Sequence, residues 1–542
     1  MFTYFHAYMP ENWKGQELRG LIDEHAGVRF CETIDLADDH KFNNLAAIGS
    51  PYYNMMKETR MPMYIDRLQG GCFLENYPYD WELVKEYEDM LGDKFIGFQM
   101  HEWASNLYGD LTRIRDSVRE QEWTKENISR EVKKNFPYNY VWMEARSVEE
   151  HVKWGNPKTL EEFRANFEEL FQSRYKLGRG RLVPCDSFAL AYQLEIKTGV
   201  KHFMPEVGAQ TPDSRVQIAY ARGMARTNQV CFGVYYEPWG GNPFSTCSYQ
   251  RDNLNEWNIE AYGPFAPKGA NGGSSRSLQK RVHNYAYFAG AEFIAEEWGM
   301  CNTFYDWVDF ELSPYGKIKY DFLQLIKKYP KETIGTPYTP VAIVFSADAL
   351  PLNDINNVND TYFNYPITGK LKETTALARK AVKTLLSDAT EMIGCETRNL
   401  INSEIPDAID VIHEDYKVLH EDYQFFVDCT GNEEFAKTHR CCKLEDAKAL
   451  VKELMPCEVE GNVHWFVNKT KDGWMIVMFN HSGIHRSVAQ GEYALPNSEQ
   501  HVKIRIKNGT DMIQLEGDTT LSCNDGAYEV TLPAGGWFLG KF

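Results

Sequence analysis

Eight short apolar runs alternate with amphipathic helical stretches over the first 300 residues, and this alternation constrains the fold more than any other feature of the sequence. Many of the runs end in a polar or acidic residue. Such alternation is typical of a β/α fold. The runs are TYFHAY (3–8), GVRFCETID (27–35), MPMYIDRLQ (61–69), KFIGFQMHEW (94–103), GRLVPCDSF (180–188), KHFMPEVG (201–208), VCFGVYYEPWG (230–240) and AEFIAEEWG (291–299).

The number of runs favours a closed (β/α)8 TIM barrel over residues 1–335. Helical segments at 80–92, 159–178 and 277–291 separate the strands, and a barrel of eight parallel strands needs roughly this length of chain. A doubly wound open sheet is the alternative, because it is built from the same alternation of strands and helices.

The pattern changes twice after the barrel. Residues 336–458 predict a small α/β domain, with strands at 341–350 and 423–431 and helices at 374–386 and 445–455. It lacks a glycine-rich nucleotide motif, so we expect it to pack against the barrel or a neighbouring subunit. Residues 459–542 show alternating strands with an Asp-Gly hairpin turn, which indicates a C-terminal β-sandwich.

Composition excludes several classes of function. The net charge is −19 with no basic stripe, which argues against a nucleic-acid partner. No apolar stretch is long enough to span a membrane, and the first residues do not resemble a secretory signal, so we expect a cytoplasmic protein. The 12 cysteines show neither a disulfide framework nor a close metal-ligand spacing, so we expect reduced thiols, no metal and no cofactor. The aromatic content, 14%, suits a surface that stacks on sugar rings.

Several acids stand where the predicted barrel strands end, which is where such barrels build their active sites. Hydrolysis of a glycosidic bond needs two carboxyl groups, one to donate a proton and one to attack or to activate water. Apolar and aromatic neighbours raise the pKa of a carboxyl group, as a proton donor at neutral pH requires. The catalytic candidates are Glu102, Glu206 and Glu237, with Glu296 or Glu297 on the last strand.

Other polar and aromatic residues near the strand ends are candidates for binding a sugar. Acids can accept hydrogen bonds from sugar hydroxyls, and tryptophan and tyrosine rings can stack on a pyranose face. Long inserts at 104–158 and 240–276 follow the fourth and seventh strands and extend this surface. The substrate-binding candidates are His101, Trp103, Asp35, Asp66, Asp186, Tyr236, Trp239, Glu297 and Trp298.

The run FIGFQMHEW resembles the fourth strand of the large retaining clan of glycoside hydrolases, where an Asn-Glu pair ends the strand and the Glu is the acid/base. The resemblance implies this role for Glu102, with His101 in place of the Asn. The clan carries its nucleophile on strand seven, which implies Glu237 of YYEPWGG.

A rival alignment implies a different nucleophile. KHFMPEVGAQTPDSR (201–215) is similar to the nucleophile strand of bacterial β-galactosidases whose barrel is followed by a trimerisation domain and a small β-domain. That alignment assigns the nucleophile role to Glu206, and it requires one more barrel strand before the strand that carries Glu206. The order of the three units also resembles that family, which implies a homo-oligomer.

The sequence therefore predicts a glycosidase, β-galactosidase-like and retaining, that removes a terminal sugar from an oligosaccharide or glycoconjugate. An inverting or endo-acting enzyme, with a strand-eight glutamate recruited, is one alternative. A non-catalytic carbohydrate-binding protein is the other, and His101 in place of the Asn is its best support.

Overall fold

The computed structural model describes the greater part of the chain. The described residues are 1–30, 41–65, 79–104, 126, 157–187, 190–208, 213–237, 275–297, 303–305, 307–352, 360–387, 400–487, 491–509 and 511–542.

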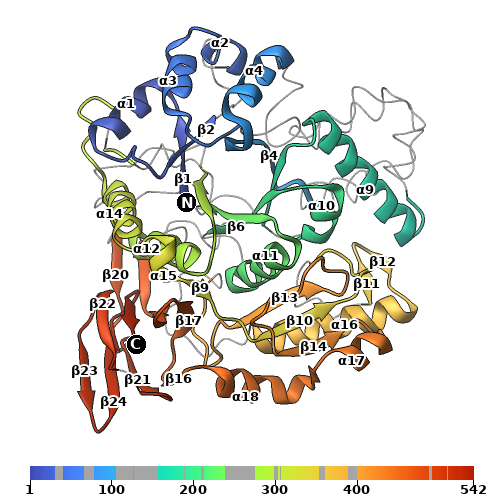
Figure 1. Ribbon diagram of the computed structural model, residues 1–542, viewed down its shortest axis with the longest axis vertical. Coiled ribbons are helices and arrows are strands. Elements are labelled where there is room, and N and C mark those ends of the chain that lie inside the picture. Colours follow the sequence, from blue (N-terminus) through green and yellow to red (C-terminus); the bar gives the residue numbers. More distant parts are fainter. Residues whose placement is uncertain are drawn as a thin grey trace.

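The first unit is a closed barrel of parallel strands that pair in chain order from β1 to β8, with β8 closing onto β1. This unit forms the upper part of the molecule in Figure 1, coloured from blue to yellow. The closed barrel confirms the predicted TIM barrel and excludes the open doubly wound sheet. The strand count also holds, so Glu206 lies on the sixth strand and Glu237 on the seventh. The strands are β1 Thr3–Tyr8, β2 Ala26–Phe30, β3 Met63–Ile65, β4 Phe95–His101, β5 Leu182–Asp186, β6 His202–Gly208, β7 Cys231–Glu237 and β8 Phe293–Glu296.

A separate apolar cluster fills the inside of the barrel. Every strand of the closed sheet presents alternate side chains to the interior, and the remaining ones pack against the surrounding helices. The interior cluster consists of Phe5, Tyr64, Ile96, Val183, Cys185, Met204, Tyr235, Phe293 and Ala295.

A β-bulge at Gly97 decides which side chains of β4 face inward. The register between β3 and β4 shifts at this point, so that Tyr64 pairs with Gly97 while Met63 pairs with Phe95. Gly97 has a φ of 129°, and a Cβ there would lie 2.3 Å from the carbonyl oxygen of Arg181. Because one residue is added, the alternation changes face after it. Phe98 consequently packs outside, and His101 points into the barrel.

Helices cover the outside of the barrel, and side chains fix where several of them start. Asp80 accepts hydrogen bonds from the backbone of Glu82 and Leu83, and Thr159 caps the next long helix through Glu162. The helices of this unit are α1 Pro10–Leu18, α2 Phe42–Leu45, α3 Pro51–Thr59, α4 Trp81–Leu91, the 3-10 turn η2 Gly92–Lys94, α9 Leu160–Leu177, α10 Tyr192–Thr198, α11 Ser214–Asn228, α12 Arg276–Phe288, α14 Pro314–Lys328 and α15 Lys331–Ile334.

The second unit is a parallel four-stranded sheet in the order β13, β10, β14, β15, with helices packed on it. It agrees with the α/β domain that the sequence predicts. Its elements are β10 Val341–Phe345, β11 Thr361–Tyr362, β12 Tyr365–Pro366, α16 Gly369–Leu385, β13 Ile409–His413, β14 Phe425–Cys429, α17 Glu433–Thr438, β15 Cys441–Cys442 and α18 Leu444–Leu454.

Among the described residues, the third unit contains two larger antiparallel sheets, as expected of a β-sandwich, and the two-stranded sheet of β19 and β20. Strand β9 belongs to it, although the sequence assigns these residues to the α/β domain, because β9 pairs with β17. The strands are β9 Thr336–Pro337, β16 Cys457–Glu460, β17 His464–Thr470, β18 Gly473–Phe479, β19 Ile484–Ser487, β20 Gly491–Ala494, β21 Gln500–Ile506, β22 Ile513–Gly517, β23 Leu521–Asn524, β24 Ala527–Leu532 and β25 Trp537–Lys541.

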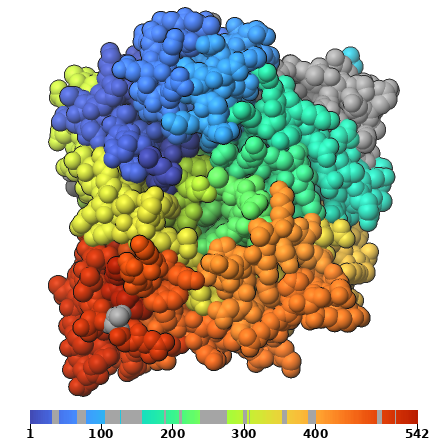
Figure 2. Space-filling view, viewed as in Figure 1, coloured from blue at the N-terminus to red at the C-terminus, as the bar shows by residue number. Residues whose placement is uncertain are grey.

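The two smaller units lie side by side beneath the barrel, with the α/β domain in orange and the β-sandwich in red (Figures 1 and 2). Helix α11 of the barrel packs directly on β13. A Cβ at Gly223 would lie 2.2 Å from the carbonyl oxygen of Val411, so this close approach requires glycine. Among the described residues, no helix combines the length and the apolar character needed to cross a membrane.

Candidate active site

Four glutamates reach the mouth of the barrel, which we define as the end where the strands finish. Glu102 directly follows β4, Glu206 lies in β6, Glu237 ends β7 and Glu297 directly follows β8. All but Glu102 are almost fully buried. The charges that act most strongly on Glu206 are those of Glu102, Glu297, Glu237 and Asp186. The structure therefore brings together carboxylates that are far apart in the sequence.

Glu206 lies at the centre of this group. Burial raises the pKa of its carboxyl group well above the usual range, and the surrounding carboxylates raise it further. Burial likewise raises the pKa of the neighbouring Cys185 thiol, with Glu206 as the next contributor. Burial and the neighbouring acids therefore favour the protonated forms of Glu206 and Cys185.

Glu102 is the most accessible of the four, because 28% of its side chain is exposed. Its backbone is left-handed with a φ of 43°, a conformation that is strained for a residue with a side chain. The Ser187 hydroxyl donates to Glu102 Oε1 over 3.4 Å. Asp186 accepts a hydrogen bond from the backbone of Ala104 and so fixes the turn that carries Glu102.

His101 joins the acids of the fourth and eighth strands. Its Nε2 lies 3.3 Å from Glu297 Oε1 and 3.8 Å from Glu102 Oε2. On the other side of the ring, the Gln99 side-chain amide lies 3.2 Å from Nδ1. The ring is held by these contacts inside the mouth, so His101 can donate a hydrogen bond to a carboxylate or contact a bound sugar.

Glu237 depends on a glycine in the neighbouring strand. Gly208 pairs with it across β6 and β7, and a Cβ at Gly208 would lie 2.7 Å from Glu237 Oε2 and 1.9 Å from its carbonyl oxygen. Any side chain at this position would displace the Glu237 carboxylate. The absence of a Cβ therefore makes room for this acid at the mouth.

Tyr236 and Glu296 are directed away from the mouth, which corrects two sequence predictions. They pair across β7 and β8, one residue before the inward-facing glutamates, and so face the helices. Tyr236 packs against the His283 ring. Glu296 lies 2.6 Å from Lys319 Nζ and 2.9 Å from His283 Nε2. Although burial alone would raise the pKa of Glu296, Lys319 and His283 hold it well below its usual range, so this acid has a structural role.

Trp103 is also not the stacking platform that the sequence predicts. Its ring is buried and packs against Phe167 and Phe171 of α9, with centroids 4.8 Å and 4.3 Å away. Its Nε1 donates to Glu195 Oε1 over 2.8 Å. A buried ring offers no free face to a sugar, so Trp103 anchors the end of β4 to helix α9.

Replacing Glu195 with glutamine is expected to flatten the pH dependence of stability. Burial raises the pKa of Glu195 from 4.5 to about 8, so the unfolded chain loses this proton at a lower pH than the folded chain. The stabilising contribution is complete below pH 4.5 and is lost as the pH rises towards 8. The glutamine of Glu195→Gln does not ionise, and its side-chain carbonyl oxygen can still accept the hydrogen bond from Trp103 Nε1. Thermal midpoints between pH 5 and 8 test this, and parallel curves for variant and wild type would contradict it.

Four predicted site residues, Asp35, Asp66, Trp239 and Trp298, lie outside the described residues. Two groups that the prediction omitted, Gln99 and Cys185, face into the barrel beside His101. The sequence contained a signal for Cys185, because Val183 and Cys185 alternate with outward-facing residues in one short strand.

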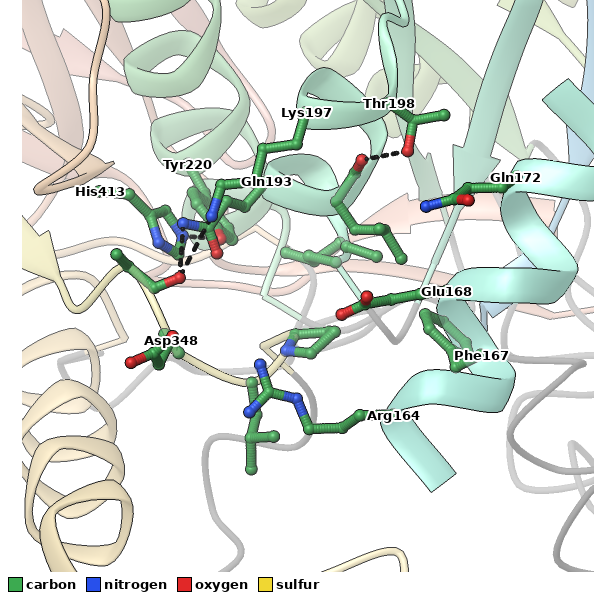
Figure 3. A pocket seen from close by; sticks show the side chains of 17 residues that line it. Arg164, Phe167, Glu168, Gln172, Gln193, Lys197, Thr198, Tyr220, Asp348 and His413 are labelled. Carbon is green, nitrogen blue, oxygen red and sulfur yellow. Dashed lines mark hydrogen bonds between the residues drawn. The ribbon is translucent and has the colours of Figure 1, made fainter. Parts of the chain in front are cut away.

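A separate cavity of about 310 Å³ lies between α9, α10 and the loop after β10 (Figure 3). Many of its polar groups already have protein partners. The Tyr220 hydroxyl contacts His413 Nε2 at 2.5 Å, and Lys197 Nζ lies 2.8 Å from Asp415. None of the four mouth glutamates lines this cavity. The cavity is therefore separate from the glutamates of the barrel mouth.

Comparison with known proteins identifies similar structures but no family. No protein-family model matches the sequence. No curated protein sequence matches it either.

Solved structures similar to the chain include three glycosidases. The catalytic module of a family 98 glycoside hydrolase from Streptococcus pneumoniae has 10% sequence identity and a TM-score of 0.43, over 100% of this chain and 98% of that one. α-L-Fucosidase isoenzyme 2 from Paenibacillus thiaminolyticus has 8% identity and a TM-score of 0.45, over 99% of both chains. A β-galactosidase from Rahnella sp. R3 has 11% sequence identity and a TM-score of 0.41, over 100% of this chain and 98% of that one. Similarity at this level does not identify a substrate, so the function has to be argued from the side chains.

Proposed function

We propose that the protein is a retaining glycosidase that removes a terminal sugar from an oligosaccharide or glycoconjugate. The observation that carries this proposal is the gathering of carboxylates from β4, β6, β7 and β8 at the mouth of one barrel. Enzymes that hydrolyse glycosidic bonds use such a pair of carboxyl groups on either side of the scissile bond.

Glu102 is assigned as the acid/base. It is the most exposed of the four glutamates, which suits a group that exchanges a proton with the leaving group and then with water. The strained turn and the Ser187 hydroxyl hold its carboxyl group in place. A fixed position matters because proton transfer requires hydrogen-bond distance to the leaving oxygen.

Glu237 is assigned as the nucleophile. It ends the seventh strand, the position that the resemblance to the retaining clan implies, and the barrel contains no extra strand that would move Glu206 there. Its carboxylate occupies the space that Gly208 leaves at the mouth.

The reaction then takes two steps. Glu102 protonates the glycosidic oxygen while Glu237 attacks the anomeric carbon, so the bond to the leaving group breaks and a covalent glycosyl-enzyme forms. Glu102, now ionised, removes a proton from water, and the hydroxide oxygen displaces Glu237 from the anomeric carbon. Two inversions at one carbon give a sugar of the original anomeric configuration.

An inverting enzyme is the second candidate, and the inward position of Glu297 favours it. Glu297 directly follows β8, the strand after the one that Glu237 ends, and its Oε1 lies 3.3 Å from His101 Nε2, so it could act as a base towards water. In that case a single displacement would give the opposite anomer.

A panel of nitrophenyl glycosides of both anomeric configurations tests the proposal. We expect hydrolysis of at least one substrate, and proton NMR of the first-formed sugar should show the configuration of the substrate. An inverted first product would instead assign the base role to another glutamate. Failure to cleave any glycoside, together with binding on a glycan array, would favour a carbohydrate-binding protein.

A further inference from the structure

Three buried side chains on neighbouring barrel strands form a group with the composition of a metal site. A ring nitrogen of His101, Sγ of Cys185 and a carboxylate oxygen of Glu206 lie within 4.8 Å of one another. Strands β4, β5 and β6 are adjacent, and His101 and Cys185 are direct partners in the register. All three side chains point to the interior just below the mouth.

A second observation indicates that something binds between these groups. Glu206 is 2% exposed, yet its Oε2 has no hydrogen-bond partner among the described residues. A buried carboxylate oxygen without a partner is costly, because it has lost its hydration.

We propose that His101, Cys185 and Glu206 bind a zinc ion at the floor of the barrel mouth. Thiolate and imidazole ligands favour zinc over magnesium or calcium, which prefer oxygen. Ligand atoms that share a tetrahedral zinc lie about 3.3–3.8 Å apart, so the observed group needs side-chain shifts of only about 1 Å. Three protein ligands leave a fourth position for water or a sugar hydroxyl, as in catalytic zinc sites.

The ion would balance the acidic mouth and would remove Glu206 from the candidate nucleophiles. It leaves Glu102 and Glu237 in their assigned roles. Sequence analysis could not find this site, because the three ligands come from three different strands and show no short spacing. The inference goes beyond the proposed glycosidase activity, since zinc binding can be measured without any sugar.

The test uses the untagged full-length protein, stripped with a chelator, reloaded with zinc chloride and analysed for metal after gel filtration. We expect the wild type to retain one more zinc ion per chain than Cys185→Ala. Glu206→Gln, which keeps the shape of the side chain, should weaken zinc binding in calorimetry by at least about tenfold. The matched control is Cys429→Ala, which removes another buried free thiol, in β14, and should bind zinc as the wild type does.

Cobalt loading of the wild type gives a readout that does not depend on the folding of a variant. A thiolate ligand produces a charge-transfer band in the near ultraviolet, and tetrahedral cobalt produces visible bands. Equal metal content in wild type and Cys185→Ala, or cobalt-loaded wild type without a thiolate band, would overturn the inference. Zinc binding without hydrolysis of any glycoside would support the metal site and contradict the proposed function. Hydrolysis without zinc binding would support the proposed function and contradict the metal site.

Discussion

Glu237→Ala is expected to lower kcat on aryl glycosides by at least about 10⁴-fold, because it removes the group that forms the covalent intermediate. Azide should restore turnover by entering the space left by the carboxylate. It would attack from the same side as Glu237, so the product should be a glycosyl azide of inverted configuration. Product analysis by NMR measures this directly.

Glu102→Ala is expected to give the glycosyl azide of the opposite configuration in the same experiment. An aryl leaving group needs little protonation, so glycosylation should survive and the second step should become limiting. Azide then attacks the glycosyl-enzyme, and the expected product is a glycosyl azide of retained configuration. The contrast between the two variants separates acid/base from nucleophile without relying on the size of the activity loss.

Glu195→Gln is the matched control for both variants. It changes another buried acid of the barrel, which contacts Trp103 and not the mouth, and should keep kcat close to that of the wild type. If Glu237→Ala retained activity within tenfold while Glu206→Ala lost it, the nucleophile would be Glu206 and the zinc inference would fall with the present assignment.

The fold was predictable because its signals are local. The helices around the barrel show apolar residues at helical spacing, and the eight strands are short apolar runs bounded by polar residues. Helix α9, for example, spans Leu160–Leu177 where the sequence predicts 159–178. The order of the units follows from the same local patterns.

The faces of the strands were harder to predict than the strands themselves. Without the bulge at Gly97, simple alternation from Ile96 would direct Phe98 inward and His101 outward. A glycine inside an apolar strand is the signal for such a bulge. Tyr236 shows the same limit, because sequence proximity to Glu237 suggested a site role while the pleat directs its ring to the helices.

Contacts between distant segments were not predictable at all. Trp103 is next to Glu102 in sequence, and an exposed aromatic ring there would suit a sugar. Its burial depends on Phe167 and Phe171, which belong to a helix that begins almost 60 residues later. Likewise, the central position of Glu206 among the acids depends on barrel closure and not on any spacing in the chain.

The joint between the barrel and the α/β domain contains a buried ion-pair network centred on Arg222 of α11. Its Nε donates to Asp410 Oδ1 over 2.6 Å and its Nη2 to Asp407 Oδ1 over 3.2 Å, and all three side chains are buried. Arg226 reaches the second oxygen of Asp410. Burial alone would raise the pKa of Asp407 and Asp410, but Arg222 and the other groups around them together outweigh it and hold both pKa values below their usual range.

Arg222→Met is expected to destabilise the protein by about 3–5 kcal/mol, because it leaves two buried carboxylates without their main counter-charge. Since both pKa values are lowered in the folded state, the stabilisation by these acids is present above about pH 4 and is lost as the pH falls further. In the variant the two folded-state pKa values rise, so these acids lose less stability as the pH falls, and the difference in stability between variant and wild type should shrink on acidification. Urea unfolding at pH 7 and a pH series of thermal midpoints measure the two effects.

The exposed Lys437–Glu433 pair is the matched control, and Lys437→Met should leave both measurements nearly unchanged. An Arg222→Met protein within about 1 kcal/mol of wild type would show that packing of α11 on β13, and not the network, holds this joint together.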